Sequence, residues 1–367
     1  HKEYRRQRQM CIRDRHEGVQ FLRFLCILWV ALFHFFYFRS FLFPFRSTFN
    51  NLFFSMGWIG VRIFFIISGF VIYLSLQNSR NFVTFLKKRA LRLYPSLWLI
   101  LPLVFLCQRY VPYSPFTELS KGSNLAISMT LLPPNTLNIP LGLNLSWLTL
   151  VLWSLKVEVF FYLTVSILYF IGPKEKCLLV LIALSFFAQL VYSTDRLETN
   201  RFGSFAIKII DAFGWKHLPW FCLGALLSQK QIILKNKRLI KKFLILGSFL
   251  LSFALTMSPE MQSIYQWLCL IVTTTISCLV ISRLRKLPLI FKPFILLGDS
   301  SYEMYLLHQG VGLTFALFLT KASGASASTS TLICATSILA AFALSHGYWH
   351  VSLRIQSRLK PAMKFSS

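Results

Sequence analysis

Long apolar stretches, separated by short polar or basic segments, recur along nearly the whole chain. Ten of them approach the length of about 20 residues that a helix needs to cross a bilayer. They lie near residues 19–38, 52–76, 91–108, 149–171, 176–193, 205–228, 239–257, 263–282, 301–320 and 330–350. The stretch 205–228 is the least regular, because it contains Lys208, Asp211 and Lys216, and Pro219 can break a helix there. The pattern predicts an all-α polytopic membrane protein, a bundle of about ten transmembrane helices.

The distribution of basic residues tests this count, because cytoplasmic loops of membrane proteins carry an excess of Lys and Arg. With the N-terminus in the cytoplasm and each stretch crossing once, 27 of the 39 Lys and Arg fall on inner segments and 7 on outer ones. We therefore expect both termini to be cytoplasmic. The expected organisation is a basic disordered tail or extraneous extension at 1–18, a transmembrane domain at 19–350 and a short basic tail at 351–367.

The overall composition excludes an ordinary soluble domain. The chain is 55% hydrophobic and 14% charged, with a mean hydropathy of +0.59, whereas soluble domains carry about 25% charged residues. The formal net charge is +27, but the basic residues lie between apolar stretches. This placement indicates contact with anionic membrane lipid and argues against nucleic acid as a partner. The eight Cys are scattered without a CxxC pair, which is typical of small buried apolar residues.

Ionisable side chains at membrane depth are costly and are therefore candidates for function. Arg23 and His34 stand eleven residues apart in the first stretch, so both project from one helix face, about 16 Å apart along the axis. A histidine can take a proton from a hydroxyl group near neutral pH. The alternative is a histidine that only hydrogen-bonds a neighbouring helix.

The second stretch combines small residues with one cation. Gly57, Gly60 and Gly69, together with Ser68, predict close packing against other helices. Arg62 lies near the predicted outer end, where we expect it to face a polar cavity.

Arg89 and Arg92 are three residues apart at the start of the third stretch and share a helix face. Paired guanidinium groups suit phosphates, to which they donate two parallel hydrogen bonds. The alternative is an ordinary anchor at the membrane surface.

Glu158 is a lone carboxylate within the fourth stretch, where it requires a cation, a histidine or a proton. One interpretation is that it orients His34 or contacts the hydroxyl groups of an acceptor. The alternative is a structural ion pair with Lys156 or Arg62.

Two histidine patterns occur late in the chain. Tyr302, Tyr305 and His308 follow one another in steps of three and share a helix face. His346 and His350 have the spacing of a metal-binding pair, but a third ligand is missing nearby, so we expect no metal.

These motifs together resemble the acyltransferase 3 family, the bacterial membrane O-acyltransferases that act on surface polysaccharides and other glycans. The resemblance covers nearly the whole chain after residue 18 and rests on five motifs in the family's order. They are Arg-x10-His at Arg23 and His34, G-x-x-G-V-x-x-F-F-x-x-S-G-F from Gly57 to Phe70, R-x-x-R with Tyr-Pro from Arg89 to Pro95, W-S-L-x-x-E from Trp153 to Glu158, and S-Y-x-x-Y-L-x-H from Ser301 to His308.

The resemblance implies a multi-pass O-acyltransferase of the bacterial inner membrane. Its donor would be acyl-CoA, with acetyl-CoA as the family default, and its acceptor a hydroxyl group of lipopolysaccharide, another cell-surface polysaccharide or a glycolipid. The implied catalytic residues are His34, as general base, and Glu158. The other implied site residues are Arg89, Arg92 and Arg23 for the CoA phosphates, and Trp153, Ser154, Tyr302 and His308 for the substrate.

A glycolipid transporter or flippase without acyl-transfer chemistry is the alternative. It also requires intramembrane charges and aromatic lining, but it consumes no CoA and does not depend on Arg89 and Arg92.

Overall fold

A computed structural model describes residues 16–192, 201–229 and 263–362 of the chain. Helices form most of this part, and no strand occurs in it. Six helices are long and apolar enough to span a membrane, at Glu17–Phe38, Ile59–Gln77, Phe82–Tyr110, Leu152–Phe170, Ile264–Arg283 and Ala327–Leu359. The chain is therefore an all-α, multi-pass membrane protein, as predicted. The stretch 239–257 lies outside the described residues, and the count of ten spans and the cytoplasmic termini stay predictions.

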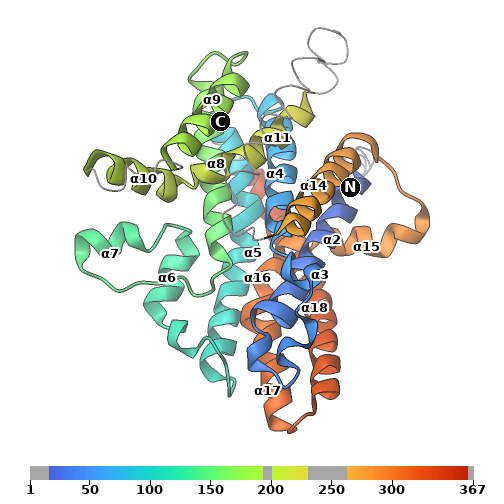
Figure 1. The fold of residues 1–367 in the computed structure, drawn as a ribbon. Coiled ribbons are helices and arrows are strands. Elements are labelled where there is room, and N and C mark those ends of the chain that lie inside the picture. Colours follow the sequence, from blue (N-terminus) through green and yellow to red (C-terminus); the bar gives the residue numbers. More distant parts are fainter. Residues whose placement is uncertain (1–15, 193–200, 230–262, 363–367) are drawn as a thin grey trace.

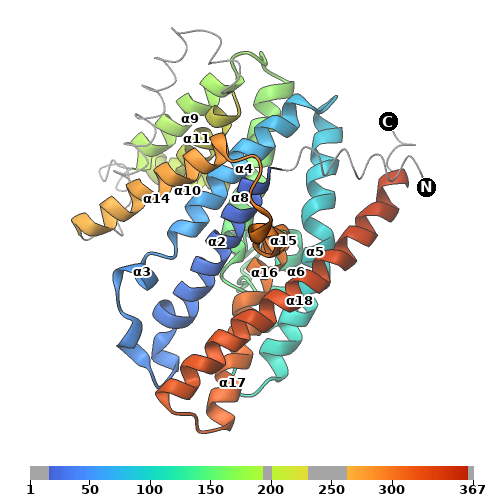
Figure 2. The same cartoon turned by 90° about the vertical axis from the view of Figure 1, so that its right-hand side faces the viewer.

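Figures 1 and 2 show the helices as a bundle crossed by short lateral elements. The elements of the first half are α2 (Glu17–Phe33), the π-helical segment η1 (His34–Phe38), α3 (Leu52–Ser55), α4 (Ile59–Gln77), α5 (Phe82–Tyr110), α6 (Gly122–Thr130), α7 (Asn135–Leu141) and α8 (Leu152–Phe170). The elements of the second half are α9 (Cys177–Tyr192), α10 (Arg201–Phe213), η6 (Trp215–His217), α11 (Leu218–Ser228), α14 (Ile264–Arg283), α15 (Lys292–Asp299), α16 (Ser301–Leu307), the π-helical segment η8 (His308–Leu313), α17 (Thr314–Ala322) and α18 (Ala327–Ala362).

Connections between helices lie at both ends of the bundle. In both views the α4–α5 connection lies at the upper end, and the α17–α18 connection at the lower end. The start of α2 meets the segment that follows α14, where the Glu17 amide donates to the Arg285 carbonyl at 3.1 Å and the Leu287 amide to Glu17 Oε2 at 2.7 Å. The first turn of α2 and the segment after α14 are thus in contact at one end of the bundle.

Helix α5 begins at Phe82, well before the predicted start at residue 91. The Asn81 side chain caps it by accepting a hydrogen bond from the Thr84 amide at 2.8 Å. The helix then continues through Pro95 and Pro102. Arg89 and Arg92 therefore lie within a regular helix, which fixes the directions of their side chains.

The prediction of one continuous span over 205–228 is wrong. The chain turns at Gly214, whose φ of +66° is a left-handed conformation that favours glycine. Helix α10 runs laterally in Figure 1, and α11 starts afresh after η6, with Pro219 in its first turn. The charged residues of this stretch are therefore placed on a lateral element and a turn.

Small residues allow close helix packing, as predicted. A Cβ atom added at Gly69 of α4 or at Gly224 of α11 would overlap a backbone carbonyl oxygen of the other helix. Gly57 and Gly60 meet the backbone of α2 in the same way.

The seven described cysteines are free thiols within helices. The α4–α11 contact brings the η6 turn against the middle of the bundle.

Among the described residues, two segments are π-helical, and each begins at a histidine. The π-helical segment η1 extends α2 from His34, and η8 joins α16 to α17 from His308. Such segments hold an extra residue within a helical turn and are frequent at functional sites. Nothing in the hydrophobic pattern of the sequence predicted them.

Candidate active site

Two cavities lie side by side, one between α2, α4, α5, α8 and α16, and the other between α4, the start of α8, η1, η6 and η8. The first, which we name the arginine cavity, has a volume of about 60 Å³, and Arg23, Arg92 and Glu158 are among its lining residues. The second, the histidine cavity, measures about 420 Å³ and includes His34 and Arg62 in its wall. Both cavities border the bundle interior, where an ionisable group is shielded from lipid.

Glu158 is the carboxylate of the arginine cavity. It accepts hydrogen bonds from Ser68 Oγ at 2.9 Å and from the Tyr162 hydroxyl group at 2.6 Å. Arg23 and Arg89 lie close enough to interact with it electrostatically. Two hydroxyl donors and two nearby cations thus supply Glu158 with the polar partners that a carboxyl group needs at this depth.

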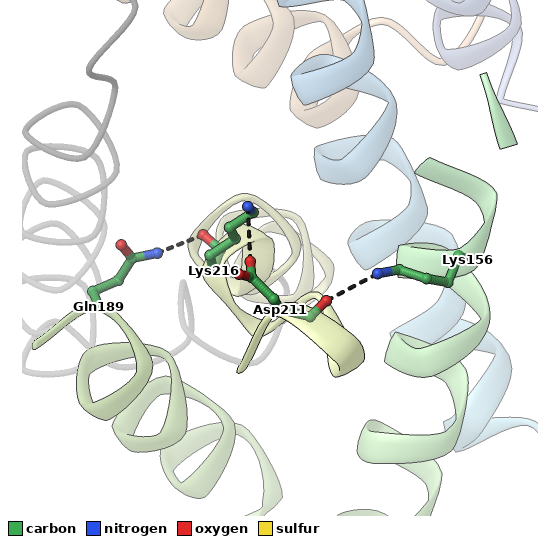
Figure 3. A network of polar contacts seen from close by, with 4 residues as sticks. All are labelled: Lys156, Gln189, Asp211 and Lys216. Carbon is green, nitrogen blue, oxygen red and sulfur yellow. Dashed lines mark hydrogen bonds and ion pairs between the residues drawn. The ribbon is translucent and has the colours of Figure 1, made fainter. Parts of the chain in front are cut away.

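The cations proposed as structural partners of Glu158 are placed elsewhere. Figure 3 shows Lys156 donating to the Asp211 carbonyl group at 2.9 Å. In the same network Lys216 pairs with the Asp211 carboxylate at 2.9 Å, and Gln189 donates to the Lys216 carbonyl group. These contacts tie α8 and α9 to α10 and η6, so Lys156 has a structural role.

In the histidine cavity, His34 lies against a second histidine. Its Nδ1 atom is 2.9 Å from the Val30 carbonyl oxygen and 3.3 Å from Nε2 of His308. The Nδ1 atom of His308 is 2.8 Å from the Tyr305 carbonyl oxygen. His308 is fully buried, whereas His34 is partly exposed and lines the cavity.

The hydrogen bonds assign the tautomer of each neutral ring. A carbonyl oxygen only accepts, so the proton of each imidazole is on Nδ1. His308 then presents the Nε2 lone pair to the Nδ1–H group of His34. The lone pair of His34 is on its own Nε2, and a proton taken there produces an imidazolium that Val30 and His308 stabilise. This arrangement suits a general base.

The two cavities share one wall. Val61, Phe65 and Tyr305 line both of them. The Tyr305 hydroxyl group is 2.7 Å from Ser154 Oγ and donates to the Val151 carbonyl group at 3.2 Å. Arg23 and His34, on one face of the same helix as predicted, therefore stand on opposite sides of a thin partition.

The structure brings most of the predicted site residues to these cavities. Ser154 and Tyr302 line the arginine cavity, and Trp153 lines the histidine cavity. Arg89 is not among the residues that line the arginine cavity. Its Nη2 atom donates to Ser75 Oγ at 2.8 Å, and its guanidinium group lies 5.7 Å from the centre of the Phe85 ring.

One predicted contact is not made. Within the described part of the chain, no hydrogen bond joins Glu158 to His34, because they line different cavities. His308, whose role in substrate binding stays a prediction, lies against His34 as its polar partner. Tyr162 was missed, although its position four residues after Glu158 on the same helix was a usable signal.

The comparisons with known proteins agree with this picture. A family model described as an acyltransferase domain, Acyl_transf_3, matches residues 16–346. No curated protein and no solved structure gave a significant match.

Proposed function

Since the chain belongs to the acyltransferase 3 family, we propose that it transfers an acyl group from acyl-CoA to a hydroxyl group of a glycan. Family membership establishes a membrane acyltransferase. The CoA donor, acetyl as the acyl group, the cell-surface glycan or glycolipid acceptor and the bacterial inner membrane are parts of the proposal.

The observation that supports this proposal best is the pair of adjoining cavities, one with cations and one with a histidine base. Acyl transfer between substrates from opposite sides of a membrane requires a donor site and an acceptor site that meet inside the bilayer. The arginine cavity and the histidine cavity meet at Val61, Phe65 and Tyr305. A transporter does not require a hydrogen-bonded histidine pair at such a junction.

We assign the donor to the arginine cavity. Arg23 and Arg92 line it and Arg89 lies on the same helix as Arg92, so the residues present fit a phosphate-bearing ligand. The cavity is narrow, at about 60 Å³, and has room for a short acyl group at the reactive end of the donor. In the predicted topology it opens toward the cytoplasm, where acyl-CoA is made.

We assign general-base catalysis to His34. Its Nε2 atom takes the proton of the acceptor hydroxyl group, and the hydroxyl oxygen forms a bond to the acyl carbon as the bond from that carbon to sulfur breaks. The proton then passes from His34 to the CoA sulfur. His308 accepts from Nδ1 of His34 throughout, and Glu158 holds Arg23 and Arg89 in place through their charges.

Membranes that contain the protein and [¹⁴C]acetyl-CoA test the proposal. We expect label to enter the membrane glycans together with release of CoA thiol, and both to be lost in His34→Ala. Full labelling by His34→Ala would refute His34 as the base. Glycolipid movement without CoA release would support the transporter instead.

A further inference from the structure

The wall of the histidine cavity is mainly aromatic. Its lining includes the indole rings of Trp58, Trp147 and Trp153. Flat aromatic faces pack well against the apolar C–H face of a sugar ring, while polar side chains between them meet the hydroxyl groups. The cavity volume of about 420 Å³ lies within the usual range for a small-ligand site. The cavity therefore suits a sugar ring.

Gln309 brings a buried amide group to this aromatic wall. It lines the histidine cavity as the second residue of η8 and is 1% exposed. Its amide oxygen Oε1 has no hydrogen-bond partner among the described residues. A buried polar atom without a partner costs free energy, because its hydration is lost and not replaced. A hydroxyl group of a ligand in the cavity can donate the missing hydrogen bond.

The position of Gln309 distinguishes it from other buried polar groups without partners. Gln108, Thr314 and Thr320 also have unpaired side-chain atoms in the described part of the chain. None of these three is among the residues that line the arginine cavity or the histidine cavity. Tyr305 lines both cavities, but its hydroxyl group already has hydrogen-bond partners. The unpaired amide of Gln309 is thus placed where a ligand can reach it.

The segment η8 also places Gln309 beside the histidine pair. His308 is the residue before it and lies 3.3 Å from His34, measured from Nε2 to Nδ1. Neighbouring Cα atoms are about 3.8 Å apart, and Gln309 and His34 line the same cavity. A hydroxyl group at Gln309 and a second one at His34 are therefore near each other, as they are on neighbouring carbons of a sugar ring.

We propose that Gln309 binds the acceptor by accepting a hydrogen bond from the hydroxyl group next to the one that is acylated. The inference rests on the proposed acyl transfer and concerns the same site. The reacting hydroxyl group lies at Nε2 of His34, its neighbour donates to Oε1 of Gln309, and the ring packs on the indoles. Two fixed points on the wall then determine which hydroxyl group of the sugar reacts.

The test uses the purified full-length protein in nanodiscs with acetyl-CoA and four acceptors, the methyl pyranosides of glucose, galactose, mannose and rhamnose. NMR of the product from the best acceptor identifies the acetylated hydroxyl group. That acceptor is then compared with its monodeoxy analogues that retain the reacting hydroxyl group. We expect kcat/KM about tenfold lower or less for an analogue that lacks a hydroxyl group on a neighbouring carbon.

Gln309→Met keeps the length of the side chain but removes the amide. It should lower kcat/KM for the complete acceptor about tenfold and remove the difference between this acceptor and the sensitive analogue. It should also acetylate more than one hydroxyl group, since one fixed point is lost. A purely structural role of Gln309 would lower kcat/KM for all acceptors by the same factor and leave the acetylated position unchanged.

Gln77→Met, at the exposed end of α4, is the matched control and should behave as the wild type. Thermal unfolding checks that each variant is folded. If Gln309→Met does not fold, Gln309→Asn replaces it, because its amide is one methylene shorter and should cause the same loss of selectivity.

The outcomes separate this inference from the proposed function. Equal kcat/KM for the acceptor and its analogues overturns the inference while acyl transfer stands. An equal loss for all of them in the Gln309 variant overturns it as well. So does acetylation of the hydroxyl group on carbon 6, which has no hydroxyl neighbour in a pyranoside, and so does CoA release without an acetylated sugar. An absence of CoA release with all four pyranosides contradicts the proposed function itself.

Discussion

The contact between the two histidines gives the sharpest test of the catalytic geometry. His308 is fully buried and donates from Nδ1 to the Tyr305 carbonyl group, so Nε2 is the atom that faces His34. Glutamine at position 308 places a carbonyl oxygen near this Nε2 position, whereas leucine has a similar size but cannot accept a hydrogen bond. The pair His308→Gln and His308→Leu therefore isolates the hydrogen bond from the packing.

The expected size of the effect follows from the charge that forms on His34. When Nε2 takes the acceptor's proton, the bond from Nδ1 to His308 becomes a hydrogen bond from a cation. Such bonds contribute about 1.5–3 kcal/mol, which corresponds to a fall in kcat of about 10- to 150-fold. His308→Leu should show this fall, and His308→Gln should stay within about threefold of the wild type because it still accepts.

Purified variants in nanodiscs, with saturating acceptor and varied acetyl-CoA, give kcat and KM separately. KM for acetyl-CoA should be unchanged, since His308 lies outside the lining of the arginine cavity. His350→Ala, on the exposed side of α18, is the control. Equal losses for leucine and glutamine, or a loss confined to KM, would refute the role of His308 as the partner of His34.

Three further predictions concern the base, the donor site and the fold. His34→Ala should reduce kcat about 10²- to 10⁴-fold, the usual contribution of a general base, and binding of radiolabelled acetyl-CoA should persist. Arg92→Gln should raise KM for acetyl-CoA about tenfold or more with little change in kcat, whereas Lys88→Gln, at an exposed position of the same helix, should not; an unchanged KM in Arg92→Gln would argue against this donor site. Gly224→Ala should destabilise the protein by about 1–3 kcal/mol through overpacking against α4, seen as a lower Tm in detergent. Gly122→Ala is its control, because a Cβ there meets no atom within 4 Å, and equal Tm values for the two variants would contradict the close α4–α11 contact.

Helical periodicity predicted the parts of the site that lie on one helix. Arg23 and His34 share a face because eleven residues are close to three α-helical turns, and both do line cavities. The same arithmetic predicted that Tyr302, Tyr305 and His308 share a helix face. Periodicity fixes directions within a helix, and that information was sufficient here.

The polar contacts between helices could not be predicted from the sequence. One of the roles expected for Glu158 was to orient His34, but the partition at Val61, Phe65 and Tyr305 puts them in separate cavities. The depth of each side chain depends on where its helix starts and how it tilts. The prediction of one span over 205–228 was wrong for a related reason. Gly214, in a left-handed conformation, turns the chain in the middle of this apolar stretch.

The two π-helical segments make the site sensitive to changes in chain length. A π turn holds one residue more than an α turn, so it behaves as an insertion stored within a helix. Removal of a residue from 34–38 or 308–313 would restore α geometry with the flanking turns close to their present orientation, and side chains within the segment would change direction by up to about 100°. One imidazole ring would then turn away from its partner while the helix kept nearly its full length. Single-codon deletions and duplications, as well as substitutions, thus offer a route by which related chains gain or lose the histidine pair.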